Sequence, residues 1–206
     1  MVEIEKSKEQ ENKENLLSKP DFVSQHRCFV AIDFPKEIRE EIIRVQSELK
    51  KKNLFHGKLV EEENLHLTLK FLGEISAEKV EEVKKKLKDV KFSEFKAYLG
   101  ELGVFSPSYI KIVWVHIIEK QILELQKKID EKLSELFPKE ERFMSHLTIA
   151  RVKDVKDKKI FLEELGKIKV QNLSFSVSGF YLLKSELTEQ GPIYSILEEY
   201  PIQVKI

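Results

Sequence analysis

The chain has 206 residues, of which 41% are hydrophobic and 9% aromatic, enough to bury one sizeable core without cross-links. Lysine and arginine together number 36, as do aspartate and glutamate, so the formal net charge is zero. This balance argues against a protein that grips long nucleic-acid duplexes through a broad basic surface, but it leaves room for a local basic pocket.

Cys28 is the only cysteine, which excludes an internal disulfide and a cluster of thiolate metal ligands. No segment has the apolar length of a signal peptide or of a membrane span, so we expect a cytoplasmic protein that contacts no membrane. Residues 1–25 are rich in Lys, Glu, Asn and Gln and predict a mobile N-terminal tail. Residues 26–206 are predicted to form a single domain.

Apolar periodicity predicts an alternation of strands and helices along the chain. Alternating patterns predict strands at 27–34, 59–60, 65–72, 95–102, 109–117, from 146, 173–183 and 193–199. Helical spacing predicts helices at 35–52, 76–90, 119–136 and 156–168, with Ser76 as an N-cap and Pro138 as a stop signal. A turn is expected at His56-Gly57.

The strand within Leu65–Gly73 has an unusual polar face. Successive side chains of a strand point to opposite faces. The predicted faces are Leu67, Leu69 and Phe71 toward the core, and His66, Thr68 and Lys70 on the other side. We interpret Lys70 as a solvated strand residue.

The same His-apolar-Thr-apolar order returns 80 residues later, in Ser145–Arg151. The same offset aligns other strands and helices, which indicates an ancient duplication with halves at about 26–105 and 106–185 and a closing segment at 186–206. The predicted fold is α+β: two lobes related by a pseudo-twofold axis, with antiparallel sheets, helices on the outside and a central cleft. This axis brings His66 and His146 to facing walls of that cleft.

Two imidazoles in one cleft suit proton transfer near neutral pH, because an unperturbed histidine titrates near pH 6.5. The hydroxyls of Thr68 and Thr148 lie on the same strand faces and can hold the oxygens of a phosphate. Arg151 or Lys70 can add a positive charge. By strand parity Arg151 is out of phase with His146, so it reaches the cleft only if the strand bends or ends first.

These paired segments in a duplicated chain resemble the 2H phosphoesterase superfamily, and in particular its RNA 2′,3′-cyclic phosphodiesterases, also called 2′-5′ RNA ligases. The resemblance covers about 26–200. It is carried by Arg27–Asp33, His66–Gly73, Gly103-Val104-Phe105, Ser145–Arg151 and Gly191-Pro192-Ile193-Tyr194.

The resemblance implies hydrolysis of a 2′,3′-cyclic phosphate to a 2′-phosphomonoester without a metal or other cofactor. His66 would donate a proton to the departing 3′-oxygen and His146 would activate water, although the symmetry of the sequence leaves these roles exchangeable. Thr68 and Thr148 would hold the phosphate with help from Arg151. The implied partners are RNA ends or nucleotides that carry a 2′,3′-cyclic phosphate, and the reverse reaction would join RNA ends. We expect a monomer.

Three alternatives are open. A zinc site is disfavoured because zinc takes three or four protein ligands and no Asp, Glu or Cys stands at ligand spacing from either histidine. A non-catalytic module that binds RNA ends or nucleotides would use the cleft but would not need two histidines. Other 2H enzymes act on other cyclic or 2′-5′-linked nucleotides. The remaining histidines, His26, His56 and His116, are interpreted as packed or capping residues.

Overall fold

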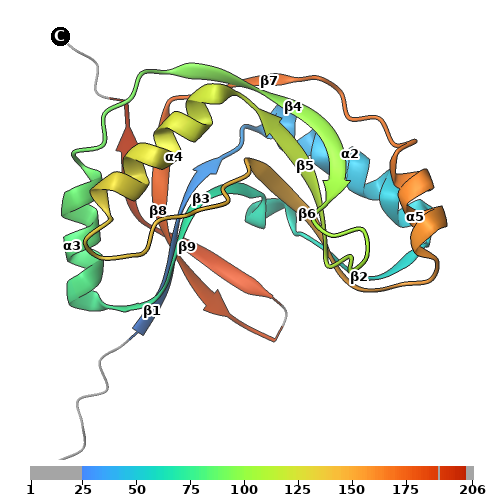
Figure 1. The fold of residues 1–206 in the computed structure, drawn as a ribbon, viewed down its shortest axis with the longest axis horizontal. Helices are drawn as coiled ribbons and strands as arrows, with labels where there is room; N and C mark the ends of the chain where they lie inside the picture. Colours follow the sequence, from blue (N-terminus) through green and yellow to red (C-terminus); the bar gives the residue numbers. More distant parts are fainter. Residues whose placement is uncertain (1–24, 190, 203–206) are drawn as a thin grey trace, which may run out of the picture.

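The structure is a computed structural model that describes residues 25–189 and 191–202, so the tail predicted for 1–25 lies almost wholly outside the described residues. Nine strands in the described part form one curled antiparallel sheet in the order β7-β4-β5-β6-β3-β1-β8-β9, with β2 paired to β6 (Figure 1). The strands are β1 (Gln25–Asp33), β2 (Phe55–Leu59), β3 (His66–Ser76), β4 (Phe95–Val104), β5 (Ile112–Ile118), β6 (His146–Val155), β7 (Ser174–Val177), β8 (Gly179–Leu187) and β9 (Pro192–Pro201).

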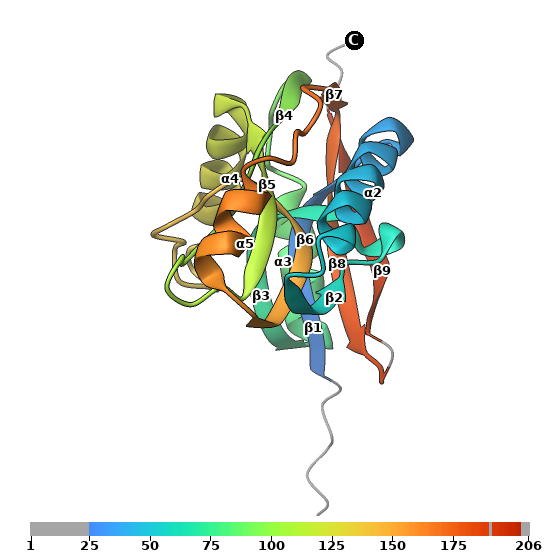
Figure 2. The ribbon, with the colours of Figure 1, turned by 90° about the vertical axis from the view of Figure 1, so that its right-hand side faces the viewer.

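Four α-helices in the described part flank this sheet, and each has one apolar face. They are α2 (Lys36–Lys51), α3 (Ala77–Leu87), α4 (Lys120–Lys132) and α5 (Lys158–Leu165). Ser76 caps α3 as predicted, since its hydroxyl accepts from the Lys79 backbone N–H at 3.3 Å. Figure 1 shows α3 and α4 at one end of the arch and α2 and α5 at the other, and Figure 2 shows the same elements from the side of α2 and α5.

The two lobes exchange elements between the predicted halves of the chain. Strand β4 closes the first half but pairs with β5 of the second, and β8 closes the second half but pairs with β1 of the first. Two helices follow the same rule, because α2 packs on β6 and α4 packs on β3, whereas α3 packs on β1 and β3 of its own half. The predicted two-lobed α+β fold is confirmed, and each lobe contains elements of both halves.

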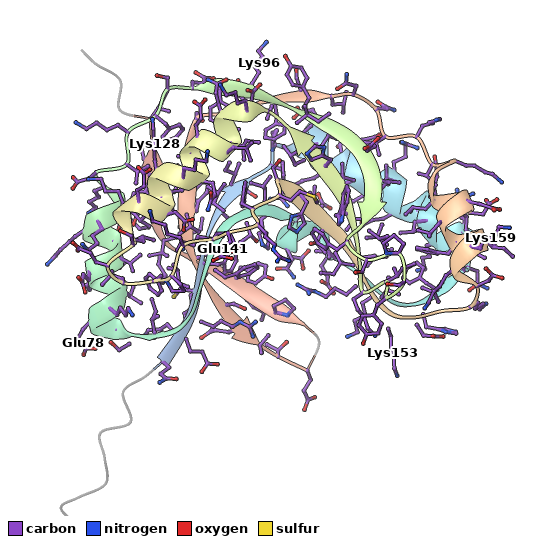
Figure 3. All side chains as sticks on the ribbon, in the orientation of Figure 1. Glu78, Lys96, Lys128, Glu141, Lys153 and Lys159 are labelled. Atoms are coloured by element: carbon purple, nitrogen blue, oxygen red, sulfur yellow. The ribbon has the colours of Figure 1, made fainter. Side chains whose placement is uncertain are left out.

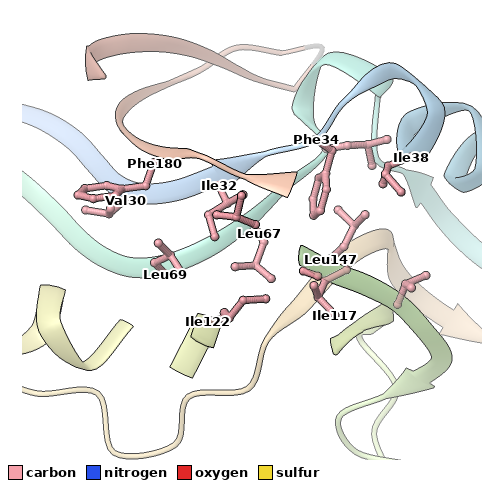
Figure 4. Close-up of a cluster of buried hydrophobic side chains, with 14 of the residues drawn as sticks. Val30, Ile32, Phe34, Ile38, Leu67, Leu69, Ile117, Ile122, Leu147 and Phe180 are labelled. Carbon is pink, nitrogen blue, oxygen red and sulfur yellow. The ribbon is translucent and has the colours of Figure 1, made fainter. Parts of the chain in front are cut away.

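The lobes meet along the central strands β3 and β6, which are joined at a single bridge between Leu67 and Leu147. Both side chains are fully buried and point into the core beside Ile122 (Figure 4). Burying a leucine side chain stabilises a fold by roughly 1.5–3 kcal/mol. Charged side chains such as Lys96 and Lys128 point outward from the periphery (Figure 3). The opposite faces of β3 and β6 form the concave face of the sheet, where His66 and His146 are partly exposed.

Each central strand contains a one-residue bulge. Opposite β1, Thr68 pairs with Ala31 and Lys70 with Val30, so Leu69 is an extra residue. Ile149 is the corresponding extra residue of β6 opposite β5. Such a bulge places two consecutive residues on one face and reverses the alternation beyond it.

Two predictions about β3 are wrong for this reason. Lys70 is not solvated but 4% exposed in the core, whereas Phe71 does not share the face of Leu69 and is 69% exposed on the concave side. The Lys70 ammonium is paired with the Asp130 carboxylate on α4 and donates to the Pro138 carbonyl at 2.8 Å. The ion pair joins β3 to α4, and the hydrogen bond to Pro138 joins it to the loop that leads into β6.

Two element boundaries also differ from the prediction. His56 and Gly57 do not form a turn but lie within β2, where Gly57 passes so close to the Arg151 backbone that a Cβ would lie 2.2 Å from its carbonyl oxygen. The strand predicted at 173–183 is two strands, β7 and β8. No helix in the described residues is long and apolar enough to cross a membrane.

Candidate active site

His66 begins β3 and is oriented from the turn before it. Its Nδ1 lies 2.8 Å from the Asn64 carbonyl oxygen and its Nε2 lies 3.0 Å from the Thr68 hydroxyl. A carbonyl can only accept, so Nδ1 carries the proton and the neutral ring presents the lone pair of Nε2 to the concave face. Burial lowers the pKa of His66 to about 4, although the Asn64 bond opposes this shift.

His146 begins β6 in the same manner. Its Nδ1 lies 2.8 Å from the Met144 carbonyl oxygen, two residues back, as Asn64 is from His66. This bond selects the same tautomer, with the proton on Nδ1 and the lone pair on Nε2. Burial lowers the pKa of His146, and the Met144 bond opposes that shift. The two rings are therefore held alike at equivalent places on the two central strands, and both are neutral bases at neutral pH.

The register between the central strands brings these groups together. Because Leu67 lies opposite Leu147 on antiparallel strands, His66 and Thr148 are neighbours across the joint, as are Thr68 and His146. Besides burial, the positive charge of Arg151 lowers the pKa of His66, as does that of His146 when it is protonated. All four predicted His and Thr residues thus lie on one face.

Arg151 also lies on this face, because the bulge at Ile149 restores its phase with His146 and Thr148. The carbonyl oxygen of the bulged Ile149 accepts from the Val60 backbone N–H at 3.0 Å and from the buried Gln46 side chain at 2.8 Å. These bonds fix the bulge that directs Arg151. On β2, Lys58 pairs directly with Arg151, which adds a second cation beside it.

Aromatic rings enclose each histidine. Phe29 lies 4.8 Å from His66 and Phe105 lies 4.8 Å from His146, measured between ring centroids. Phe71 extends the first group, 6.3 Å from Phe29, and Trp114 extends the second, 5.8 Å from Phe105. These rings remove water from the imidazoles, which is the physical cause of their lowered pKa values.

Sequence reasoning missed two residues of this surface. His116 was interpreted as packed, yet it pairs directly with His146 across β5 and β6 and helps to lower the pKa of His146. Tyr194 on β9 lies 5.2 Å from His66 between ring centroids. The segment Gly191–Tyr194 carried part of the family resemblance, so its sequence held a signal, but nothing in it assigned a position to Tyr194.

Within residues 25–189 and 191–202, no group of three or more His, Cys, Asp or Glu side chains is arranged to hold a metal ion. The donors that do converge are imidazoles, hydroxyls and a guanidinium, a set suited to proton transfer around an anion.

Comparison with known proteins decides the family. The model of one family, described as "LigT like Phosphoesterase", matches residues 32–114 and again residues 115–194. The chain belongs to the LigT-like phosphoesterase family. The two successive matches agree with a duplicated chain and divide it after residue 114, nine residues later than the predicted boundary at 105.

Curated members of the LigT-like family resemble the chain over nearly their whole length. A protein of Methanocaldococcus jannaschii named RNA 2′,3′-cyclic phosphodiesterase is 42% identical over 177 residues, covering 84% of this chain and 99% of that protein. One of the same name from Methanothermobacter thermautotrophicus is 33% identical over 180 residues, covering 84% and 97%.

Solved LigT-like structures share the fold. TT0787 of Thermus thermophilus superimposes with a TM-score of 0.73 at 25% identity, covering 85% of this chain and 97% of that one. Escherichia coli LigT without ligand gives a TM-score of 0.71 at 25% identity, covering 87% and 99%. LigT has also been crystallised with 3′-AMP, and that structure gives a TM-score of 0.69.

Proposed function

We propose that this chain is an RNA 2′,3′-cyclic phosphodiesterase, a phosphoric diester hydrolase that opens a 2′,3′-cyclic phosphate to a 2′-phosphomonoester. The observation that carries the proposal is the matched pair of imidazoles on one concave face, each with Nδ1 bound to a backbone carbonyl. Relatives of this name up to 42% identical to the chain support the substrate class.

The reaction needs a base for the attacking water and an acid for the departing 3′-oxygen. His146 takes a proton from water through Nε2, and His66 donates one to the 3′-oxygen, in the assignment that the family resemblance implies. Both rings are neutral before substrate binds, so the acid needs a raised pKa in the complex. A bound phosphate anion raises it, because a nearby negative charge favours the imidazolium.

The remaining groups bind the phosphate and its nucleoside. The hydroxyls of Thr68 and Thr148 and the guanidinium of Arg151 contact non-bridging oxygens, where negative charge grows as phosphorus becomes five-coordinate. The exposed ring of Phe71 offers a nucleobase a surface on which to stack. With the 5′-hydroxyl of a second RNA in place of water, the same groups would join the ends: that oxygen attacks the phosphorus of the cyclic phosphate, the 3′-oxygen leaves with a proton, and a 2′-5′ bond remains.

The test is product analysis on an RNA that ends in a 2′,3′-cyclic phosphate, with and without EDTA. We expect a 2′-phosphate product, no effect of EDTA, and a fall in kcat of about 10²–10⁴ for each of His66→Ala and His146→Ala. The matched control is His56→Ala, whose side chain is 64% exposed on β2. A normal rate in either folded active-site variant contradicts the proposal, and binding of the RNA without turnover by the unmodified protein favours a nucleotide-binding module.

The proposal includes two further expectations, about the oligomeric state and about the localisation of the protein. The concave face has both histidines in one chain, so a monomer suffices for catalysis, and size-exclusion chromatography coupled to light scattering measures this directly. Localisation in the cytoplasm, where RNA ends are processed, is checked by fractionation of the source cells.

A further inference from the structure

Strand β9 lies in the predicted closing segment, outside both halves, yet its first residues reach the catalytic face. The Tyr194 ring lies 5.2 Å from His66, at an interplanar angle of 87°. It also lies 4.9 Å from Phe29 at 72°. His66, Phe29 and Tyr194 thus form a triangle of rings in mutual contact, which restricts the directions in which the imidazole can turn.

The phenol of Tyr194 lies near Arg151 of the other lobe. Burial raises the pKa of the phenol, and the nearby positive charge of Arg151 lowers it. A guanidinium has only donors, so the phenol oxygen can only act as an acceptor toward Arg151. Tyr194 therefore lies against His66 of β3 and near Arg151 of β6.

The backbone of the same segment is also linked to His66, through Asn64. The Asn64 side chain donates to the Pro192 carbonyl at 3.0 Å, and the Asn64 carbonyl accepts from His66 Nδ1 at 2.8 Å. The turn before Pro192 depends on Gly191, whose φ of 150° is rarely adopted by other residues. The start of β9 is thereby attached to the peptide group that orients the imidazole.

We propose that Tyr194 is a positioning residue that holds His66 and Arg151 in a fixed relation to each other. The hairpin of β8 and β9 then completes a site to which each half of the chain supplies a histidine and a threonine. This inference rests on the proposed function for its effect on turnover, but its effect on the imidazole can be measured without any substrate.

The charged and titratable groups around His66 come from three strands. The carboxylate of Asp33 on β1 favours the imidazolium, whereas Arg151 and His146 on β6 disfavour it. Tyr194 on β9 contributes through burial. Replacing it changes the water around the ring and leaves those three charges in place, so the titration of His66 reports on the contact.

Two variants of Tyr194 distinguish the effect of its phenol on Arg151 from the effect of its ring on His66. Tyr194→Phe keeps the ring and loses the phenol oxygen, so we expect kcat/KM for a 2′,3′-cyclic nucleotide to fall about tenfold, since Arg151 is then held less well against the oxygens where charge grows. In an Arg151→Ala background the same change should have no further effect. Tyr194→Leu removes the ring, and the pKa of His66, followed by NMR titration of its imidazole protons, should rise from about 4 toward 6.5.

The matched control is Tyr98→Phe, a tyrosine of β4 that is 38% exposed beside Ser174 and Ile118; it should alter neither kcat/KM nor the titration. Additive effects of Tyr194→Phe and Arg151→Ala, or an unchanged His66 titration in Tyr194→Leu, overturn the proposal. If Tyr194→Leu does not fold, the double variant of Tyr194→Phe and Arg151→Ala still tests the proposal. A shifted His66 titration in a protein that hydrolyses no cyclic phosphate supports the positioning and refutes the proposed function.

Discussion

Phe71 and Arg151 occupy equivalent places on the central strands, five residues after His66 and His146. The bulges at Leu69 and Ile149 turn both side chains onto the concave face. The His and Thr positions obey the pseudo-twofold relation, but this pair does not, because one side chain is aromatic and the other cationic. A substrate with a base at one end and a phosphate at the other therefore meets an asymmetric surface, which can fix its direction of binding.

Arg151→Ala should lower kcat/KM for a 2′,3′-cyclic nucleotide by about 10²-fold, because a fixed positive donor to the phosphoryl oxygens is lost. Arg151→Lys should have a kcat/KM between those of Arg151→Ala and the unmodified protein, since lysine keeps the charge but lacks the planar fork of the guanidinium. Steady-state kinetics measure this. The control is Lys96→Ala at the outer edge of β4 (Figure 3). Equal losses in Lys96→Ala and Arg151→Ala would show that general surface charge, not this contact, matters.

Stability measurements can test the bulge of β3. The bulge buries Lys70 and exposes Phe71, whereas strict alternation predicts the opposite. Asp130→Ala leaves the Lys70 ammonium buried without its carboxylate and should cost about 3–5 kcal/mol in unfolding free energy. Phe71→Ala removes a side chain that is 69% exposed and should cost less than about 1 kcal/mol. Urea denaturation of the two variants gives both numbers. The opposite order would mean that Phe71, not Lys70, faces the core.

The hydroxyls of Thr68 and Thr148 can be removed without a change of shape. Thr68→Val and Thr148→Val should each lower kcat by about tenfold to a hundredfold through the loss of one donor to the phosphate. Thr→Ser at either position should restore most of the rate, because serine carries the same hydroxyl. Circular dichroism checks that each variant is folded. Valine variants with full activity would remove the threonines from the mechanism.

The lowered pKa of His66 predicts a pH dependence of stability. The imidazole titrates at about 4 in the folded protein against 6.5 as its ordinary value. Between these values the unfolded chain binds a proton that the folded chain does not, so the unfolding free energy falls as pH is lowered through this window. The loss levels off below pH 4 and amounts to at most about 3 kcal/mol.

Urea denaturation at pH 7 and pH 4.5 checks this prediction when the protein is compared with His66→Gln. The variant lacks the titrating group and should lose less stability between the two pH values. An identical loss in both proteins would mean that other groups, such as the carboxylates of buried ion pairs, account for the whole dependence.

Cys28 should be inert in the folded protein. Its thiol is 1% exposed on β1, and burial raises its pKa to about 11. At pH 8 the thiolate that reacts with alkylating reagents is therefore scarce and shielded. Labelling followed by mass spectrometry should show no adduct on the native protein and complete reaction in 8 M urea. Rapid labelling of the native protein would contradict the buried placement of β1.

The local parts of this structure could be predicted from sequence, and the parts that depend on distant partners could not. The repeated His-x-Thr segments, the helices and the two-lobed α+β fold follow from patterns within short windows, and the fold is confirmed. Alternation could not reveal the bulges at Leu69 and Ile149, because an extra residue is defined only by the strand opposite. Hence Lys70 and Phe71 were assigned to the wrong faces, and Arg151 was left out of phase.

The same reason explains what was missed at the candidate site. Lys70 finds its carboxylate at Asp130, sixty residues away, and no pattern around either residue signals the other. Tyr194 reaches His66 only because β9 pairs with β8 and β8 with β1. The roles of the two histidines, the two threonines and Arg151 stay predictions that the variants above test.

The exchange of β4 and β8 between the halves has a consequence for the history of the chain. A gene cut between the halves would yield two fragments, each lacking a neighbour for one strand, and each could find that neighbour only in the other. An ancestor with a single repeat would accordingly have worked as a strand-swapped homodimer, with one histidine contributed by each subunit. Fusion of two such copies would make this pairing intramolecular, and it would allow equivalent positions to differ, as Phe71 and Arg151 do.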